Sequence, residues 1–471
     1  MIASKTANSV TRLRWPDLGT PRADRADGAT VEIAGWIATT DRTDHFLLSP
    51  EPSCCAGCPP PRDPLFAIEV FATAPIAAQP QALRLTGTWR ARPPDPHATP
   101  TAFRYQLHNA RPLDPPGWHA ITRRAVLSTA PLFCIAGTAQ ADEATARQAI
   151  AATTPVDIHS HAGAIIGVTR VKAAAPFRNV ADPMRAGGMA AVCFAIVSDS
   201  PCHRTYPDHT IHPYRTPDPG ELYAYGQLSF ARVLALAREQ NLAIITDAAA
   251  LQAARAGTAS AIIAAEGADF LEGRPDRVDE AYEKWQLRHL QLTHYRVNEL
   301  GDIQTEAPEH GGLTDIGAEV IRRCNTRGLV VDVAHGTYDL VKRAASVTTK
   351  PLVLSHTSLS SAPGPRSRTI SPDHALAIAA TGGVIGVWPP VSVYPHLNAM
   401  AAGIARLADL VGVDHVGIGS DTMGLTVHSV FDNYAELPAL AAALLNVGFN
   451  QQDTGKILGG NYVRIFAASL A

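Results

Sequence analysis

Beyond Thr154 the chain alternates short apolar runs with helical patterns, and this rhythm constrains its fold more than any other feature. The runs are centred on Val156, Val192, Ile244, Ile262, Leu290, Val330, Val353, Val384 and Val416. Helices are predicted at 221–240, 247–256, 275–288, 313–327, 372–381 and 397–411. Strands that alternate with helices form parallel βα units, so the fold class is α/β. The short run at Ile244 ends in Thr246 and Asp247, which suit a helix N-cap, and the other eight runs predict a (β/α)8 TIM barrel over 151–471.

A different pattern occupies residues 25–112. Five short segments there alternate apolar and polar residues: Val31–Ile37, Phe46–Leu48, Phe66–Phe71, Leu83–Trp89 and Phe103–Leu107. Proline and glycine separate the segments, so we expect a small all-β domain at 25–112, and five strands suit an OB-like barrel. A chain of 471 residues has room for both domains, since a domain averages about 150 residues.

Residues 113–150 are predicted to link the two domains, because the segment from 112 to 118 contains three prolines. Arg123 and Arg124 precede an apolar run at 125–141 that ends in Ala139-Gln140-Ala141, which resembles a twin-arginine export signal with its cleavage site. Such signals stand at the N terminus, whereas a domain precedes this one. Two interpretations stay open. In the first, the segment directs export to the periplasm or associates with the membrane through 125–141. In the second, the protein is cytoplasmic, and the run is a linker helix or a relic of gene fusion.

Composition narrows the possible partners. A net charge of -3 supplies no basic surface for nucleic acid, so a small-molecule substrate is expected. Seven cysteines in a long chain do not indicate a disulfide framework. The cluster Cys54, Cys55 and Cys58 has no second cysteine pair, which disfavours a structural zinc site.

The segment from Cys202 to His212 is interpreted as a solvated loop, with a lid over the site as the alternative. The sequence leaves the oligomeric state open and is compatible with a homodimer.

The predicted strands end in polar residues. In a parallel barrel the active site lies at the carboxyl ends of the strands, where this chain has Asp157, His159, His161, Glu266, His294, His335, His356 and Asp421. Burying so many polar groups together would be costly without a metal. His159 and His161 stand two apart on a strand and face the same side. Imidazoles and carboxylates without thiolates favour Zn²⁺, and Glu266 could bridge two ions, with His335 and His356 on the second.

Eight segments in order resemble the membrane (renal) dipeptidase family, peptidase family M19, a metallopeptidase branch of the amidohydrolase superfamily. They are Val156–His161, Ala265–Gly267, Leu292–His294, Gly312–Gly317, Val331–His335, Leu354–His356, Gly419–Asp421 and Ile457–Arg464. The resemblance extends from Val156 to Phe466. It implies that His159, His161 and Glu266 bind one zinc and that Glu266, His335 and His356 bind the other. It further implies that His294 stabilises the tetrahedral intermediate, that Asp421 transfers the proton and that Arg368 binds the substrate carboxylate.

The chain departs from the family pattern at two positions. The family usually has aspartate where this chain has His161, as the wider superfamily does. The family's arginine is typically followed by asparagine, whereas Thr369 follows Arg368 here, and Arg366 is an alternative carboxylate ligand.

These residues predict a zinc-dependent dipeptidase that cleaves its substrate with a metal-activated hydroxide, since coordination lowers the pKa of water to about 7. Asp421 could accept the proton, and His294 could donate to the oxyanion. The planar guanidinium of Arg368 suits a carboxylate. Two alternatives are an amidohydrolase of N-acyl amino acids, cyclic amides or lactones, and a catalytically silent metal-binding scaffold.

Overall fold

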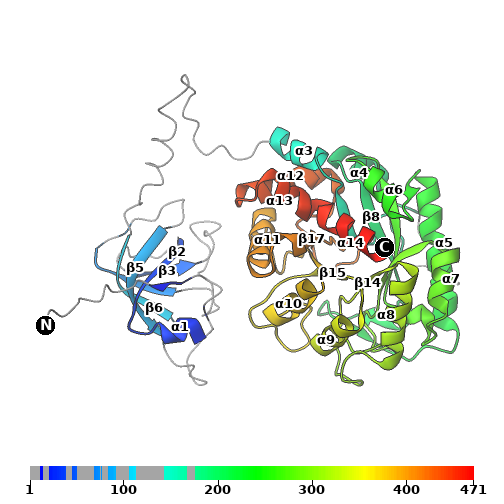
Figure 1. Cartoon of the computed structure of the whole chain (residues 1–471), viewed down its shortest axis with the longest axis horizontal. Coiled ribbons are helices and arrows are strands. Elements are labelled where there is room, and N and C mark those ends of the chain that lie inside the picture. The colour runs from blue at the N-terminus through cyan, green and yellow to red at the C-terminus, as the bar shows by residue number, and fades with distance from the viewer. Residues whose placement is uncertain are drawn as a thin grey trace. The chain divides into compact units, whose positions relative to one another are not determined.

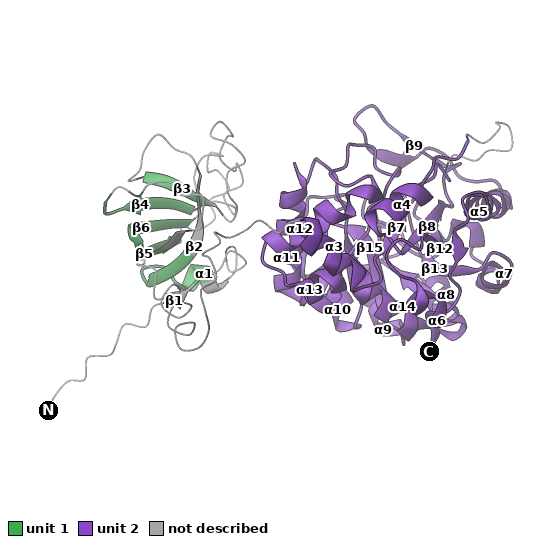
Figure 2. Cartoon of the chain, turned by 90° about the horizontal axis from the view of Figure 1, so that it is seen from above, with its two compact units in different colours: residues 1–135 green, residues 136–471 purple. Residues whose placement is uncertain are grey.

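The computed structural model contains two compact units, residues 1–135 and 136–471, shown in Figure 1 and Figure 2. The structure describes residues 11–13, 18, 21–38, 45–49, 68–74, 76, 83–91, 105–112, 143–166 and 176–471. The apolar run at 125–141 and the cluster Cys54, Cys55 and Cys58 lie outside these residues. Within them, no helix has both the length and the apolar character needed to cross a membrane.

The first unit is a small β-barrel. Its elements are β1 Thr11–Arg12, α1 Pro21–Arg25, β2 Thr30–Ala38, β3 His45–Ser49, β4 Ile68–Ala72, β5 Leu83–Ala91 and β6 Tyr105–Pro112. The strand order is β1-β2-β3-β4-β6-β5, and β5 pairs back with β2, which closes a ring of the five predicted strands. Alternate residues of these strands, among them Val31, Phe46 and Trp89, are buried in one apolar core. The all-β prediction is confirmed, and the closed five-stranded ring agrees with an OB-like barrel.

The second unit is a parallel barrel of eight strands. They are β7 Val156–Ser160, β8 Ala191–Val197, β12 Ser260–Glu266, β13 Leu287–Gln291, β14 Val330–Asp332, β15 Leu352–Thr357, β16 Val384–Val387 and β17 Val416–Ile418. They are hydrogen-bonded in the order β17-β16-β15-β14-β13-β12-β8-β7. The run at Ile244 is, as predicted, no barrel strand: β11 Ala243–Ile244 pairs outside the ring with β12, and Asp247 caps the next helix by accepting from the amide of Ala250.

The first and last strands close the ring. The amide of Asp421 donates to the carbonyl of His159 at 3.0 Å, and the amide of His161 donates to Thr422 at 2.9 Å. Beneath this seam the buried carboxylate of Asp157 accepts from the amide of Ser420 at 2.9 Å and from the Tyr434 hydroxyl at 2.7 Å. The seam therefore fixes β7 and the loop after β17 relative to each other.

Helices surround the barrel (Figure 1). Those predicted from the sequence are present as α5 Glu221–Glu239, α6 Ala248–Ala253, α7 Arg277–Lys284, α8 Asp315–Arg327, α10 Pro372–Ala380 and α11 Leu397–Val411. Helices not predicted are α3 Glu143–Ala151, α4 Ala181–Gly187, α9 Tyr338–Val347, α12 Leu437–Asn446, α13 Gln451–Gly455 and α14 Asn461–Leu470.

Two apolar cores hold this unit together. One lies between the strands and the surrounding helices and includes Phe194, Phe230 and Leu290. The other fills the barrel, where inward-facing residues such as Val156 and Val384 pack against Phe466 of α14. Because these residues begin their strands, α14 covers the amino end of the barrel and leaves the carboxyl end for the functional site.

Candidate metal centre and active site

Glu266, the last residue of β12, lies at the centre of the site. Five histidine Nε2 atoms stand 3.2 to 3.5 Å from its two carboxylate oxygens. Oε1 faces His159, His335 and His356, and Oε2 faces His161 and His294. The structure thus brings together all five histidines that the sequence placed at strand ends, and Glu266 is the residue they share.

Asp421 completes the cluster from the loop after β17. Its Oδ1 lies 3.4 Å from Nε2 of His161 and 4.0 Å from Nε2 of His159. Asp421 and His335 both adopt positive φ, 49° and 67°, which is uncommon for residues other than glycine. Such backbone strain costs about 1–3 kcal/mol at each residue and is characteristic of functional sites.

Neighbouring oxygens orient the imidazoles. Nδ1 of His161 lies 2.7 Å from the carbonyl oxygen of Ala195, and Nδ1 of His356 lies 2.9 Å from Oγ of Ser355. Nδ1 of His294 lies 2.7 Å from Oδ1 of Asp199, a fully buried carboxylate. A hydrogen bond at Nδ1 leaves Nε2 free to face the centre of the site, as metal-binding histidines require.

The donor set fits metal ions. Nε2 of His335 lies 3.0 Å from Nε2 of His356, and the corresponding atoms of His159 and His161 are 3.3 Å apart. Two ring nitrogens this close together must share a proton or hold a cation between them. Three sets of ligand atoms around the centre lie within 4.8 Å of one another, namely His159/His161/Asp421, His159/Glu266/His356 and Glu266/His294/His335. Buried nitrogen and oxygen donors without sulfur match the preferences of zinc and related divalent metals.

The site's electrostatics also favour a cation. Burial by itself lowers the pKa of His161, but hydrogen bonds to Asp421 and Glu266 outweigh this effect and raise the pKa to about 10. Burial lowers the pKa of His356 to about 4, with His159 adding to the effect. The carboxylates thus attract positive charge. Burial lowers the pKa of both His335 and His356, so these two imidazoles stay neutral and able to act as ligands.

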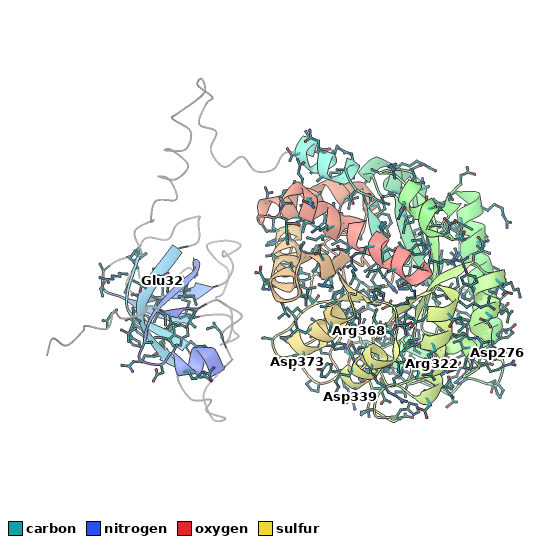
Figure 3. The ribbon with its side chains drawn as sticks, viewed as in Figure 1. Glu32, Asp276, Arg322, Asp339, Arg368 and Asp373 are labelled. Carbon is teal, nitrogen blue, oxygen red and sulfur yellow. The ribbon has the colours of Figure 1, made fainter. Side chains whose placement is uncertain are left out.

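Arg368 approaches the site from the loop after β15, and in the view of Figure 3 it lies away from the outline of the barrel unit, whereas Asp276 and Asp339 lie near it. Its guanidinium donates to Oε1 of Gln304 at 2.8 Å and lies 5.4 Å from the ring centre of Trp388. Its Nε atom is buried without a hydrogen-bond partner. Among the described residues, no carboxylate lies within ion-pair distance of Arg368, so the cation is available to an anionic group of a ligand. Arg366, the sequence alternative, is exposed.

Several residues near the site were not predicted. Asp199 follows β8 and Trp388 follows β16, so the strand-end rule that identified the histidines would also have found them. Tyr295 packs between His294 and His335, with ring centres 4.5 and 4.9 Å away. Gln304 lies within a loop, where no sequence pattern marks it.

Fold and site together define a (β/α)8 barrel with a buried histidine and carboxylate centre suited to metal ions. The chain belongs to the membrane dipeptidase family, peptidase family M19, whose family model matches residues 144–470. The family resemblance recognised in the sequence is therefore confirmed.

Curated relatives of the chain include two fungal dipeptidases. Dipeptidase verJ of Clonostachys rogersoniana is 30% identical over 219 residues, which cover 45% of this chain and 55% of the relative. Dipeptidase aclJ of Aspergillus oryzae is 30% identical over 223 residues, which cover 44% of this chain and 51% of the relative. The chain thus spans about half the length of the curated relatives it matches.

Solved structures show the same fold. The probable dipeptidase PvdM from Pseudomonas aeruginosa superposes with a TM-score of 0.58 at 17% identity, covering 70% of this chain and 98% of that one. A metallopeptidase from Rhodobacter sphaeroides, liganded with a phosphinate mimic of the dipeptide L-Ala-D-Ala, superposes with a TM-score of 0.53 at 21% identity, covering 61% and 89%.

Proposed function

We propose that the chain is a metal-dependent dipeptidase with two zinc ions per site, bridged by Glu266. The observation that carries this proposal is that two features occur in one site. The first is a buried centre of five histidines around Glu266. The second is Arg368, which forms no ion pair with a described carboxylate. The centre suits hydrolysis, and the arginine suits a substrate with a free carboxylate. Similarity to named dipeptidases and to the phosphinate-liganded metallopeptidase supports the choice of substrate.

His159, His161 and Glu266 would hold one ion, with Asp421 also within reach, and Glu266, His335 and His356 would hold the other. When bound, the ions lower the pKa of the attacking water and polarise the scissile carbonyl.

The remaining residues bind and orient the substrate and move the proton. Arg368 holds the carboxylate through its planar guanidinium, which Gln304 fixes at 2.8 Å. Nε2 of His294 lies 3.2 Å from Oε2 of Glu266, and from there the protonated imidazole would donate to the substrate's carbonyl oxygen and stabilise the charge that develops during attack. Asp421 takes the proton from the attacking water and returns it to the leaving amine.

The test combines metal analysis with a substrate panel. The purified full chain should contain close to two zinc ions and should hydrolyse dipeptides drawn from a library with L and D residues at both positions. Exhaustive chelation should abolish hydrolysis, and zinc or cobalt should restore it. Hydrolysis of N-acyl amino acids or lactones in preference to every dipeptide would replace the proposal with the amidohydrolase alternative, and activity that survives full metal removal would refute both.

A further inference from the structure

A β-hairpin stands over the carboxyl end of the barrel. Strands β9 His203–Thr205 and β10 Ile211–Pro213 pair in antiparallel fashion within the long loop after β8. Figure 2 shows β9 at the opposite end of the barrel unit from the C terminus. At the hairpin's tip the amide of Tyr206 donates to the carbonyl of Thr210 at 2.8 Å. The hairpin therefore has a defined structure over the end of the barrel that carries the site.

Side-chain contacts tie the hairpin to loops on both sides. Nδ1 of His212 lies 2.5 Å from Oε1 of Glu306, which belongs to the loop after β13. The hydroxyl of Thr426, in the loop after β17, donates to the carbonyl of His209 at 3.0 Å. In the ring, β12 separates β8 from β13, and β7 separates β8 from β17. The hairpin thus contacts the loops after β13 and β17, which agrees with the alternative of a lid, while residues 207–210 at its tip are exposed, as predicted for a solvated loop.

His203 is the hairpin residue that faces the site. Its ring centre lies 5.2 Å from that of His294 and 5.9 Å from that of Tyr295, and its side chain is 15% exposed. Nε2 of His203 lies 3.3 Å from Oδ1 of Asp199, within ion-pair distance. Both ring nitrogens are buried, and neither forms a hydrogen bond with a described residue. His203 therefore has hydrogen-bonding capacity that the described residues do not use.

Arg368 enters the mouth from the other side. Its backbone carbonyl accepts from the hydroxyl of Thr357, the last residue of β15, at 2.8 Å. Three strands separate β15 from β8 in either direction around the closed ring, so the two strands are diametrically opposite. A peptide whose carboxylate binds Arg368 and whose scissile bond lies at Glu266 would extend its amino end from the β15 side of the mouth toward the β8 side, where His203 lies.

We propose that hairpin β9–β10 limits the substrate to two residues, with His203 as the wall that meets its amino end. This inference rests on the proposed dipeptidase function and adds the reason for its length limit. A free amino group fits beside His203, which can accept a hydrogen bond from it. A further residue or an N-acyl group would collide with the hairpin, because the contacts to Glu306 and Thr426 hold it in place.

The experiment compares substrates that differ only at the amino end: a hydrolysed dipeptide, its N-acetyl derivative, and the tripeptide made by adding one N-terminal alanine. The double variant Glu306→Gln/Thr426→Val frees the hairpin without touching the site. We expect its kcat/KM for the two extended substrates to rise relative to the dipeptide by about tenfold, the scale on which single steric contacts discriminate substrates. His203→Ala, which shortens the wall and leaves both anchors in place, should shift the ratio in the same direction.

Asp414→Asn is the matched control, because Asp414 forms an exposed ion pair with Lys456 at 2.8 Å just before β17, at the amino end of the barrel. It should leave the substrate ratio unchanged. Trypsin cleavage after Arg204 reports whether the double variant has loosened the hairpin. An unchanged ratio in a variant that is cleaved faster, together with an unchanged ratio in His203→Ala, would overturn the inference. Failure of the wild-type chain to hydrolyse any dipeptide would instead refute the proposed function, and the length limit with it.

Discussion

His294 and Asp199 form a buried pair in which Nδ1 of the imidazole lies 2.7 Å from Oδ1 of the carboxylate. The other oxygen of Asp199 accepts from the amide of Tyr295 at 3.0 Å, so the carboxylate fixes both the ring and the backbone that follows it. Of the five histidines around Glu266, His294 is the one whose Nδ1 faces a carboxylate. This pair sets the direction in which Nε2 of His294 points.

Asp199→Ala should therefore lower kcat by about 10- to 100-fold, the usual effect of removing a partner that orients a ligand or catalytic imidazole. KM should change much less, because the proposed mechanism assigns the substrate carboxylate to Arg368 and not to His294. Asp199→Asn keeps an acceptor of the same size and should retain more activity than the alanine variant. Steady-state kinetics of the three proteins checks this order, and equal kcat values in wild type and Asp199→Ala would remove Asp199 from the positioning role.

Arg368→Ala should weaken kcat/KM for free dipeptides by about 2 kcal/mol or more, because a charge-assisted pair with the substrate carboxylate is lost. C-terminally amidated dipeptides should lose little, since they carry no carboxylate. The matched control is Arg366→Ala, which removes an exposed arginine two residues away. Equal losses on free and amidated substrates would show that Arg368 supports the site without binding the carboxylate.

His161→Asp should bind the metal at its half of the centre more tightly. An imidazole that must lose its proton before it can bind the ion is replaced by an anionic ligand beside Glu266 and Asp421, and the added negative charge attracts a divalent cation. Calorimetric titration of the chelated proteins with zinc measures the effect as a lower dissociation constant for the weaker of the two sites. A higher dissociation constant in the variant would indicate that the aspartate is too short to reach the ion in this barrel.

The loop after β13 provides a prediction about stability and pH. Oδ1 of Asp302 accepts from the amide of Glu309 at 2.7 Å, and Oδ2 accepts from the amide of Gly312 at 2.7 Å. Burial alone would raise the pKa of Asp302, but these hydrogen bonds reverse the effect and lower it. Because the folded-state pKa is depressed, the stabilisation is present at neutral pH and is lost as the pH falls below the ordinary carboxyl value of about 4.

Asp302→Asn should reduce the free energy of unfolding at pH 7 by about 1–3 kcal/mol, since the amide group turns an NH₂ toward one of the two backbone donors. The difference between wild type and variant should shrink as the pH falls below about 4. Denaturant unfolding at a series of pH values gives both quantities. A difference that stays constant down to pH 3 would mean that the Asp302 charge does not stabilise the loop.

The sequence predicted the barrel and the centre of the site because both depend on local patterns. Apolar runs mark strands, and the residues that end them point to the barrel mouth, which is why His335, His356 and Glu266 were found without a structure. The same rule applied to the second strand would have revealed Asp199. Gln304 and the contact between His212 and Glu306 could not be predicted, because they depend on how loops separated by many residues fold over one another.

The helices missed by the sequence have similar causes. In α12 apolar residues occur on nearly every face, so no helical period stands out from the surrounding chain. The last turns, α13 and α14, are separated by a kink at Gly459, which interrupts the pattern expected of one longer helix. Their packing on α3 and the strand ends, rather than their own periodicity, makes them stable.

The seam between β7 and the loop after β17 has a consequence for synthesis of the protein. His159 and His161 emerge from the ribosome well before Asp421 and the α14 residues that close the amino end of the barrel. A nascent chain that has not yet reached Asp421 therefore lacks one of the side chains that surround Glu266. We expect chains that stop before Asp421 to bind zinc more weakly than the full chain does.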